Sequence, residues 1–454
     1  MKFLETDIGF YRKLVGIAFP IAMQSVITVG VNLVDTIMLG QLGETALSAS
    51  SLANQFITLF IFMCMGISMG ASVLTGRFWG ARDMLSLKKV VTIAYRIGLG
   101  IALFFTLVNF FFAEQIMSFY SAEAAVIEAS TIYLRWSTAT YLLMALTTIS
   151  TNVIRSVGVN HISFIGALSS FGVNIGANYV LIFGKFGFPE MGVAGAALGT
   201  VIARIVETAI MCIYVFYVDK KLAYRIRDLF TKCGDMLQEF LRISIPVMLS
   251  DSLLGIGESV LAVIMGHIGS QFVAANAITV VVQRLSTIFI SGMAHAGCII
   301  TTQTLGKKDI EGAKRQGTTF LLVGLAVGIV AAGVITLLKT PVINSYNITD
   351  ETKLIAHNLM NAISLIVVFR SANSILTKGV LRGGGDTKFL VLADTSMMWL
   401  VSIPLGALAG LVLNLPPFWT YVCLYSDQII KAVWCVFRLR SGKWIKKIHG
   451  VNHK

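Results

Sequence analysis

The sequence predicts an all-α integral membrane protein with twelve transmembrane helices in two six-helix lobes. A parallel internal repeat relates the lobes, with a pseudo-two-fold axis along the membrane normal. Three observations predict this class: the 454 residues are 56% hydrophobic and 13% charged, with a mean hydropathy of +0.79; apolar segments recur along the chain; and the second half repeats the first. Soluble proteins carry about 25% charged residues, so we expect neither a soluble enzyme nor a nucleic-acid-binding protein.

Each predicted span has roughly 20 or more mostly apolar residues, the length that a helix needs to cross the hydrocarbon core. We place the helices at residues 14–40, 46–76, 90–112, 127–151, 162–184, 191–218, 239–267, 272–305, 317–339, 354–377, 389–412 and 417–438. The first span is too long for the apolar region of a signal peptide, so we expect no cleavable leader.

The basic residues orient these spans, because Lys and Arg concentrate on cytoplasmic loops. With both termini inside, 27 of the 36 Lys and Arg residues fall on inner segments, whereas only Lys185, Lys339 and Lys353 fall on outer loops. The net charge of +13 therefore reflects topology and contact with anionic lipids. We expect a multi-pass protein with both termini in the cytoplasm.

A single constant shift of the sequence, the one that carries Pro20 onto Pro246, aligns the first spans of the two halves without a gap. The other matched pairs include Gly40 with Gly266, Gly43 with Gly269, Gly66 with Gly292 and Asp83 with Asp309. After one inserted residue, VIRSVG (153–158) also matches VLRGGG (380–385). The predicted domains are an N-lobe at 1–218, a basic cytoplasmic linker at 219–238, a C-lobe at 239–440 and a basic cytoplasmic tail at 441–454. A parallel six-plus-six repeat is typical of transporters.

Asp35 is the strongest functional candidate among the charges within the spans, because no basic residue lies within two turns of it. An ionisable residue at membrane depth is costly and marks a functional site by default. At about 1.5 Å of rise per residue, Asn174, Asn178 and Thr200 lie at a similar depth in the outer leaflet. Their oxygens could bind a hard cation together with Asp35, or Asp35 could carry a proton. Alternatively, the two asparagines only link helices.

Pro20 and Gly30 are candidate hinge residues in the first helix. Pro20 removes the backbone hydrogen bond to Gly16 and favours a kink, and Gly30 is a second weak point before Asp35. A bendable helix that carries the lone carboxylate is a candidate switch. A static packing kink is the alternative, since Pro246 repeats the proline.

Other acidic residues within the spans have local partners or lie near solvent. Arg204 and Glu207 are three residues apart, and Asp427 and Lys431 are four apart. Both spacings allow an ion pair on one helix face. Asp394 lies near the cytoplasmic end of its span, where we expect solvent or lysine side chains to reach it.

Several stretches of the chain resemble the multidrug and toxic compound extrusion (MATE) family, in its bacterial NorM-like branch. They are FPIAMQSVITVGVNLVDTIMLGQLG in the first span, GVNIGANYVLIFGKFGFPEMGVAGAALGT in the fifth and sixth, and the repeated loops around VIRSVG and VLRGGGD. The resemblance covers essentially the whole chain.

This resemblance implies a cation-coupled antiporter, not an enzyme, that exports cationic or amphipathic drugs in exchange for H⁺ or Na⁺ and uses no cofactor. The cation site of the family corresponds here to Asp35, Asn174, Asn178 and Thr200, so Na⁺ is the one metal ion to consider. We expect small-molecule drugs and membrane lipids as partners, no nucleic acid, a monomer, and a location in the bacterial plasma (inner) membrane.

The C-lobe departs from the family pattern. NorM-like members often carry a glutamate in the seventh helix and an aspartate in the tenth, where this chain has Leu254 and Ser371. Asp251 and Glu258, seven residues apart on one face of the seventh helix, are candidates to replace them around a C-lobe cavity. The loss of two carboxylates weakens a sodium site more than a proton site, so we favour H⁺ coupling.

Two other transporter classes are alternatives. A lipid-linked oligosaccharide flippase of the same superfamily handles anionic pyrophosphate lipids, which call for an arginine-rich cleft. The arginines available for that role are Arg96, Arg204, Arg284 and Arg370. A major facilitator transporter also has a parallel repeat, but its loop motif GxxxDRxGRR is not matched by GRFWGARDMLSLKK.

Overall fold

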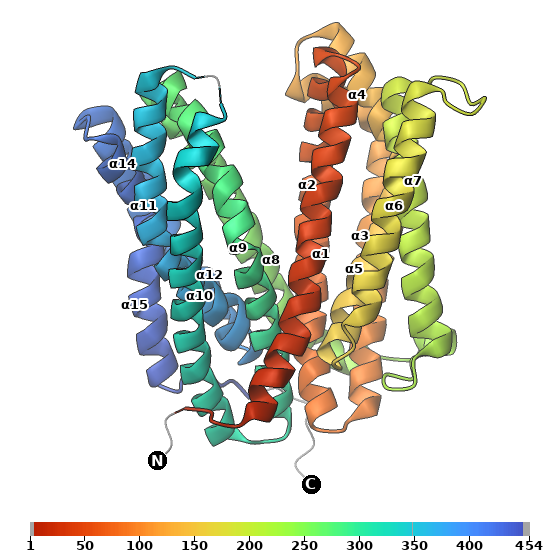
Figure 1. The fold of residues 1–454 in the computed structure, drawn as a ribbon. Helices are drawn as coiled ribbons and strands as arrows, with labels where there is room; N and C mark the ends of the chain where they lie inside the picture. The colour runs from red at the N-terminus through yellow and green to blue at the C-terminus, as the bar shows by residue number, and fades with distance from the viewer. Residues whose placement is uncertain (1–3, 347, 448–454) are drawn as a thin grey trace. The chain divides into compact units, whose positions relative to one another are not determined.

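The computed structural model describes residues 4–346 and 348–447, and all regular elements within these ranges are helical (Figure 1). The helices are α1 (Ile8–Gly40), α2 (Glu44–Gly80), α3 (Met84–Tyr120), α4 (Ala124–Trp136), α5 (Thr140–Ser156), α6 (His161–Phe183), α7 (Gly192–Ile213), η1 (Tyr214–Val218), η2 (Ile226–Phe230), α8 (Gly234–Ile268), α9 (Ser270–Gly306), α10 (Ile310–Asn344), α11 (Asp350–Ser374), η3 (Ile375–Leu381), α12 (Thr387–Met397), η4 (Met398–Ser402), α13 (Ile403–Ala407), η5 (Leu408–Val412), α14 (Pro417–Leu424) and α15 (Ser426–Arg440).

Each of the twelve predicted spans corresponds to a helical segment of the structure. Ten of the described segments are long and apolar enough to cross a membrane as continuous helices. The fourth and twelfth spans are instead each formed by two shorter helices, α4 with α5 and α14 with α15. The predicted fold class is therefore confirmed.

Both interruptions occur where a polar side chain takes a backbone group that a helix would otherwise use. Between α4 and α5, the Asn109 amide donates to the carbonyl oxygen of Leu134 at 2.7 Å, and Thr138 Oγ1 donates to the carbonyl of Arg135 at 2.7 Å. Between α14 and α15, the Asp427 N–H donates to Ser402 Oγ at 2.8 Å. Side-chain bonds to backbone groups compete with the helical ladder.

The repeat extends to the helix ends and turns. The helices α2 and α3 begin at Glu44 and Met84, and the shift that defines the repeat carries these two positions onto the first residues of α9 and α10. Asp83 caps α3 by accepting from the Ser86 N–H at 3.1 Å, and Asp309 caps α10 by accepting from the Gly312 N–H at 2.8 Å. Arg82 and Lys308 precede these caps with φ of 60° and 65°. The two turns are thus built in the same way.

The chain forms two compact units. The boundaries between them lie within α1 and α8, the first helix of each half of the repeat. Unit 1 comprises Met1–Ala22 with Leu249–Lys454, and unit 2 comprises Met23–Met248. The junctions at Ala22/Met23 and Met248/Leu249 are equivalent positions of the repeat, and each follows its proline by two residues. The predicted lobes at 1–218 and 239–440, which are defined by the repeat, stay a prediction. Residues 448–454 of the predicted tail lie outside the described residues.

Unit 2 has an aromatic core between α2, α3 and α5. The Phe60 ring lies 5.1 Å from Tyr141 and 5.4 Å from Phe105, measured between ring centroids, and all three side chains are buried. Contacts of this kind orient aromatic rings as well as burying them. Helices α6 and α7 pack together beside this core (Figure 1).

Unit 1 packs α9, α10 and α11 together and includes the N-terminal part of α1. The Glu5 N–H donates to Thr319 Oγ1 at 2.9 Å, the Phe10 and Phe320 rings lie 5.6 Å apart, and Lys13 donates to Gln303 at 2.8 Å. These contacts attach the start of α1 to α9 and α10.

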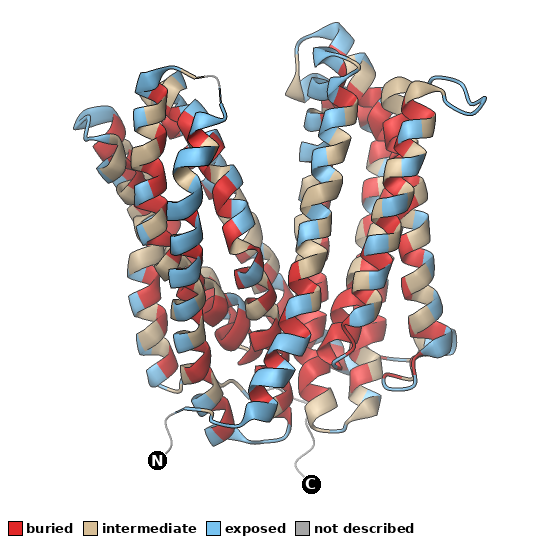
Figure 2. Ribbon diagram, viewed as in Figure 1, coloured by how far each residue is buried: buried red, intermediate tan, exposed pale blue. Residues whose placement is uncertain are grey.

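Large apolar side chains are exposed along many helices, while buried residues line the faces between helices within each unit (Figure 2). On α3, for example, Phe110, Phe111 and Phe119 are 65%, 65% and 89% exposed. Such surfaces are stable against lipid and unstable in water. With the ten apolar helices, they identify a multi-pass membrane protein.

The predicted linker is folded onto α3. Tyr224 shares a hydrogen bond with Thr92 at 2.8 Å, Lys88 pairs with Asp228 at 2.9 Å, and the Arg96 guanidinium donates to the Leu229 carbonyl at 2.7 Å. Burial raises the pKa of Tyr224 above its ordinary value, so its hydroxyl remains protonated. The linker is thus held by neutral and charged contacts along one helix.

Candidate cation site

The close packing of α6 and α7 fixes the position of Asn178. A Cβ on Gly195 would stand 2.6 Å from the carbonyl oxygen of Leu181, and a Cβ on Gly199 would collide with Asn178 Oδ1. Small residues four apart allow membrane helices to approach this closely. Asn178 therefore lies flat against α7, with its amide nitrogen directed elsewhere.

That nitrogen meets Asp35 of α1. Asn178 Nδ2 donates to Asp35 Oδ1 at 2.6 Å and lies 3.4 Å from Asn174 Oδ1. Asn174 and Asn178 are buried, 2% and 0% exposed, and Asp35 is half-buried. An amide N–H donated to a carboxylate stabilises its ionised form. A proton on Asp35 would remove the charge and so weaken this bond.

Thr200 is connected to Asp35 by way of Tyr133, a residue that the sequence did not identify. The buried Tyr133 of α4 lies within reach of Thr200 and of Asn54 on α2, and close enough to Asp35 for an electrostatic interaction. A tyrosine in an apolar span has no local feature that distinguishes it from a packing aromatic. Only the fold brings Tyr133 to the site.

A basic group that interacts with this site is Arg204, one turn after Thr200 on α7. Its guanidinium forms the predicted ion pair with Glu207 at 2.7 Å and also interacts electrostatically with Asp35. Arg204 is thus shared between a close carboxylate and a more distant one.

The two candidate hinge residues lie within an unbroken helix. α1 runs from Ile8 to Gly40 through both Pro20 and Gly30. A Cβ on Gly30 would stand 3.6 Å from the Phe171 ring of α6, an ordinary contact distance. Gly30 therefore lies where α1 faces the helix that carries both asparagines.

The C-lobe candidates do not form one group. Asp251 pairs with the buried Arg382 at 3.1 Å, whereas Glu258 is exposed. Leu254 packs at the edge of the apolar core, and Ser371 is buried with no hydrogen-bond partner for its hydroxyl among the described residues. The equivalent N-lobe arginine, Arg155, donates to Gln24, four residues after Pro20.

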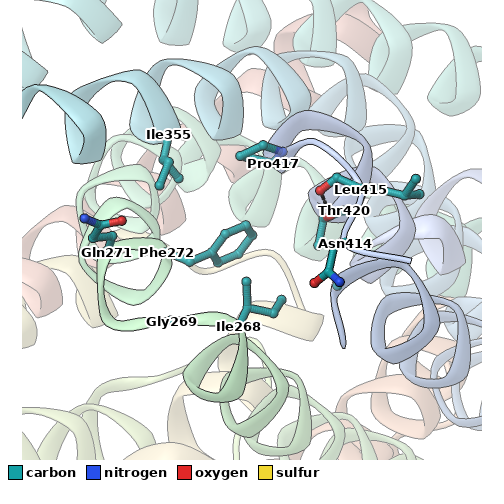
Figure 3. A pocket seen from close by; sticks show the side chains of 10 residues that line it. Ile268, Gly269, Gln271, Phe272, Ile355, Asn414, Leu415, Pro417 and Thr420 are labelled. Atoms are coloured by element: carbon teal, nitrogen blue, oxygen red, sulfur yellow. Dashed lines mark hydrogen bonds between the residues drawn. The ribbon is translucent and has the colours of Figure 1, made fainter. Parts of the chain in front are cut away.

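A separate pocket lies in unit 1, at the turn between α8 and α9 (Figure 3). It has a volume of about 240 Å³, and its polar lining residues are Gln271, Asn414 and Thr420. Phe272 and Pro417 form part of its apolar wall. None of the residues that line it is ionisable, so this pocket does not offer the chemistry of the Asp35 group.

Comparison with protein families gives one match that covers most of the chain. The MatE family model matches residues 20–180 and again residues 246–408. Each half of the repeat therefore matches the same model once.

Individual relatives align over nearly the full length. An uncharacterized transporter, YisQ, of Bacillus subtilis (strain 168) is 23% identical over 437 residues, covering 96% of this chain and 95% of the relative. A probable multidrug resistance protein NorM of Thermotoga maritima is 24% identical over 442 residues, covering 96% and 93%.

Solved structures share the fold at lower identity. A multidrug resistance MATE family transporter in an outward-facing conformation matches with a TM-score of 0.86 at 18% identity, covering 97% of this chain and 99% of that one. A MATE structure described as the bent conformation also matches with a TM-score of 0.86, covering 97% and 99%.

Proposed function

Because the chain belongs to the MATE family of transporters, we propose that it exports cationic or amphipathic compounds in exchange for H⁺, with Asp35 as the coupling carboxylate. The observation that carries this proposal is the 2.6 Å contact between Asn178 Nδ2 and Asp35 in a half-buried setting. A carboxylate held by a neutral amide keeps its charge available to a proton or to a cationic substrate.

Competition at this one carboxylate supplies the coupling. The ionised Asp35 attracts a cationic drug, and a proton from outside neutralises it. Neutralisation removes the charge and weakens the hydrogen bond from Asn178, so α1 is held less firmly against α6 and bends near Pro20. Bound drug then leaves outward, the two units change their relative orientation, and the proton is lost inside.

The orientation of the amide groups supports H⁺ over Na⁺. A sodium ion needs several oxygen ligands, but Asn178 directs a nitrogen to Asp35 and its oxygen to Gly199. The C-lobe positions at Leu254 and Ser371 add no carboxylate. A proton needs only one carboxyl oxygen.

We place the protein in the bacterial plasma membrane, as a monomer with both termini in the cytoplasm.

The lipid-flippase alternative has less support. Of the four arginines available to bind a pyrophosphate, Arg96 donates to backbone carbonyls of the linker and Arg204 pairs with Glu207. Both are therefore already engaged by other groups.

The test uses everted membrane vesicles and a fluorescent cationic dye. Dye uptake is measured under a proton gradient without sodium, and then with sodium after the proton gradient has been collapsed. Asp35→Asn keeps the shape of the side chain and removes its titration, and Glu190→Gln makes the equivalent change at an exposed carboxylate of the same unit. We expect uptake under the proton gradient alone, its loss in Asp35→Asn and its retention in Glu190→Gln.

Each other outcome rejects part of the proposal. Uptake in the Asp35→Asn variant would remove Asp35 from the mechanism. Uptake only with sodium would replace H⁺ as the coupling ion. No uptake by folded wild-type protein in either condition would favour the flippase, which is then tested with a fluorescent pyrophosphate lipid.

A further inference from the structure

Each half of the repeat contains a buried arginine in the same turn. Arg155 and Arg382, 7% and 4% exposed, occupy equivalent positions in the repeated loops VIRSVG and VLRGGG. In both turns the arginine carbonyl accepts from the N–H of a glycine three residues later at 2.9 Å. These glycines, Gly158 and Gly385, have φ of 84° and 82°. The two arginines therefore project from equivalent backbones, and any difference between their partners comes from the surrounding side chains.

Each arginine bonds to the first helix of its own half, a few residues after the proline of that helix. The Arg155 guanidinium donates to the side-chain oxygen of Gln24 on α1. The Arg382 guanidinium donates to Asp251 on α8 at 3.1 Å. The acceptor is thus a neutral amide on α1 and a carboxylate on α8.

Both bonds lie just past the junctions between the two units. α1 enters unit 2 at Met23, and α8 enters unit 1 at Leu249. Gln24 follows the first junction by one residue, and Asp251 follows the second by two. Arg155 lies in unit 2 and Arg382 in unit 1, so each arginine attaches the first helix to the unit that the helix has just entered.

The attachment of α1 can break without leaving a bare charge. Arg155 Nε also donates to Ser163 Oγ of α6 at 3.3 Å, and Glu207 of α7 interacts electrostatically with the guanidinium. Arg155 can therefore release Gln24 and keep another acceptor and a nearby carboxylate.

The attachment of α8 has no such alternative. Arg382 Nε has no hydrogen-bond partner among the described residues, and the position that is a serine in the first half is Leu390 in the second. Asp394 also interacts electrostatically with Arg382, but this carboxylate is already paired with a lysine at 2.9 Å. Separation of Arg382 from Asp251 would leave a buried charge without its bonded counter-ion, which costs more than the loss of a neutral acceptor.

We propose that Arg155 and Arg382 are positioning residues that anchor the first helix of each half, and that the stronger anchor on α8 makes α1 the helix that bends during transport. The role in transport rests on the proposed antiport, in which α1 bends near Pro20; the unequal strength of the two anchors does not. Because Gln24 is neutral, α1 leaves its anchor without the separation of two opposite charges. α8 stays attached to unit 1.

Hydrogen–deuterium exchange of the purified protein, read by mass spectrometry, tests the anchors without a transported compound or an ion gradient. The amides to follow are those just past the prolines, at 22–28 in α1 and 248–254 in α8, with each rate corrected for its intrinsic value. Gln24→Glu gives α1 a carboxylate acceptor of the same shape, and Asp251→Asn gives α8 a neutral one.

The matched controls make the same changes at exposed positions. Gln41→Glu adds a carboxylate just after the end of α1, where the side chain is exposed. Asp235→Asn removes a carboxylate from the exposed start of α8, where it pairs with Lys89 at 2.7 Å. Neither control changes the acceptor of a buried arginine.

We expect the α1 segment of the unaltered protein to exchange faster than the α8 segment. Gln24→Glu should slow the α1 segment and Asp251→Asn should speed the α8 segment, each by about tenfold, because a carboxylate binds the guanidinium more strongly than an amide does. The controls should leave both segments unchanged. Equal exchange of the two segments in the unaltered protein, or an α1 segment that Gln24→Glu does not slow, would overturn the proposal.

If Asp251→Asn does not fold, Arg382→Lys replaces it. This change keeps the positive charge but removes the planar guanidinium, and it should speed exchange in the α8 segment alone. Unchanged exchange in that segment would also count against the anchor.

Dye uptake in vesicles is the second readout. Gln24→Glu should lower the maximal rate and leave the dye concentration at half-maximal rate unchanged, because it opposes the bending of α1 but keeps Asp35. An unchanged maximal rate would overturn the role of the anchors in transport. Exchange that follows the expectation in a protein that takes up no dye would reject the antiport and keep the unequal anchors, so the two failures are distinguishable.

Discussion

At the scale of single residues, the feature that most affects the candidate cation site is the direction in which the Asn178 amide points. Its nitrogen is bonded to Asp35 at 2.6 Å, and its oxygen has no hydrogen-bond partner among the described residues and lies against Gly199. The absence of a side chain at Gly199 is what allows this orientation. Gly199 therefore supports the arrangement of the candidate cation site.

Gly199→Ala should disrupt the Asp35 group, because the added Cβ collides with Asn178 Oδ1. Overpacking of this kind costs about 1–3 kcal/mol of folding stability, and the displaced amide loses its bond to the carboxylate. We expect a lower melting temperature in detergent and reduced dye uptake in vesicles.

The matched control for this prediction is Gly176→Ala on α6, where a Cβ would meet none of the described residues within 4 Å. Replacing a mid-helix glycine by alanine without a clash stabilises by about 0.5–1 kcal/mol, so the two substitutions should move the melting temperature in opposite directions. Equal effects would show that the space at Gly199 is not critical.

At the scale of helices, two glycines allow close packing of α8 and α1, the first helices of the two halves. A Cβ on Gly66 of α2 would stand 2.6 Å from Met248 Cα of α8, and a Cβ on Gly292 of α9 would stand 2.5 Å from the Ala18 carbonyl oxygen of α1. Gly66 and Gly292 are a matched pair of the repeat. Each contact lies next to a junction between the two units of the chain.

Gly66→Ala and Gly292→Ala should therefore both destabilise the protein, and by similar amounts. The obstructing atoms are backbone atoms of a packed helix, which cannot move aside as a side chain can, so the cost should reach or exceed about 3 kcal/mol. Thermal unfolding in detergent measures it. Gly16→Ala on α1 should have no such effect, because no part of the chain that the structure describes lies within 4 Å of the added carbon. If it is equally destabilising, the close contacts are not the cause.

At the scale of the whole molecule, the charges of the loops and the repeat predict one orientation in the membrane. Lys185 lies on a loop predicted to face outward, and Lys221 on the linker predicted to face the cytoplasm; both are exposed. Because basic residues are retained on the cytoplasmic side, this orientation should be the same in every molecule.

Single cysteines test this orientation. In a background without the six native cysteines, Lys185→Cys should react with a membrane-impermeant thiol reagent added to intact cells, and Lys221→Cys only after the cells are opened. The opposite pattern would invert the predicted topology, and reaction at both positions in intact cells would indicate mixed insertion.

The sequence by itself determined the membrane class, the twelve helical segments and the repeat, because hydropathy and matched residues depend only on the order of the side chains. It also placed Asp35 and Asn178 at one depth, since the rise of a helix per residue is fixed. It predicted the Arg204–Glu207 pair because partners three apart share a helix face.

The tertiary structure decided what depends on rotation and on contacts between distant segments. Helical spacing pairs Lys431 with Asp427, but the closer partner is Asp394, 37 residues away in the chain. Asp394 is accordingly buried and paired with a lysine. Of the two environments that we predicted from its position in the span, solvent or lysine side chains, the structure has the lysine. Likewise, which end of the Asn178 amide meets Asp35, and the arrival of Tyr133 beside Thr200, follow from the packing of α4, α6 and α7, because depth along a helix says nothing about the direction in which a side chain points.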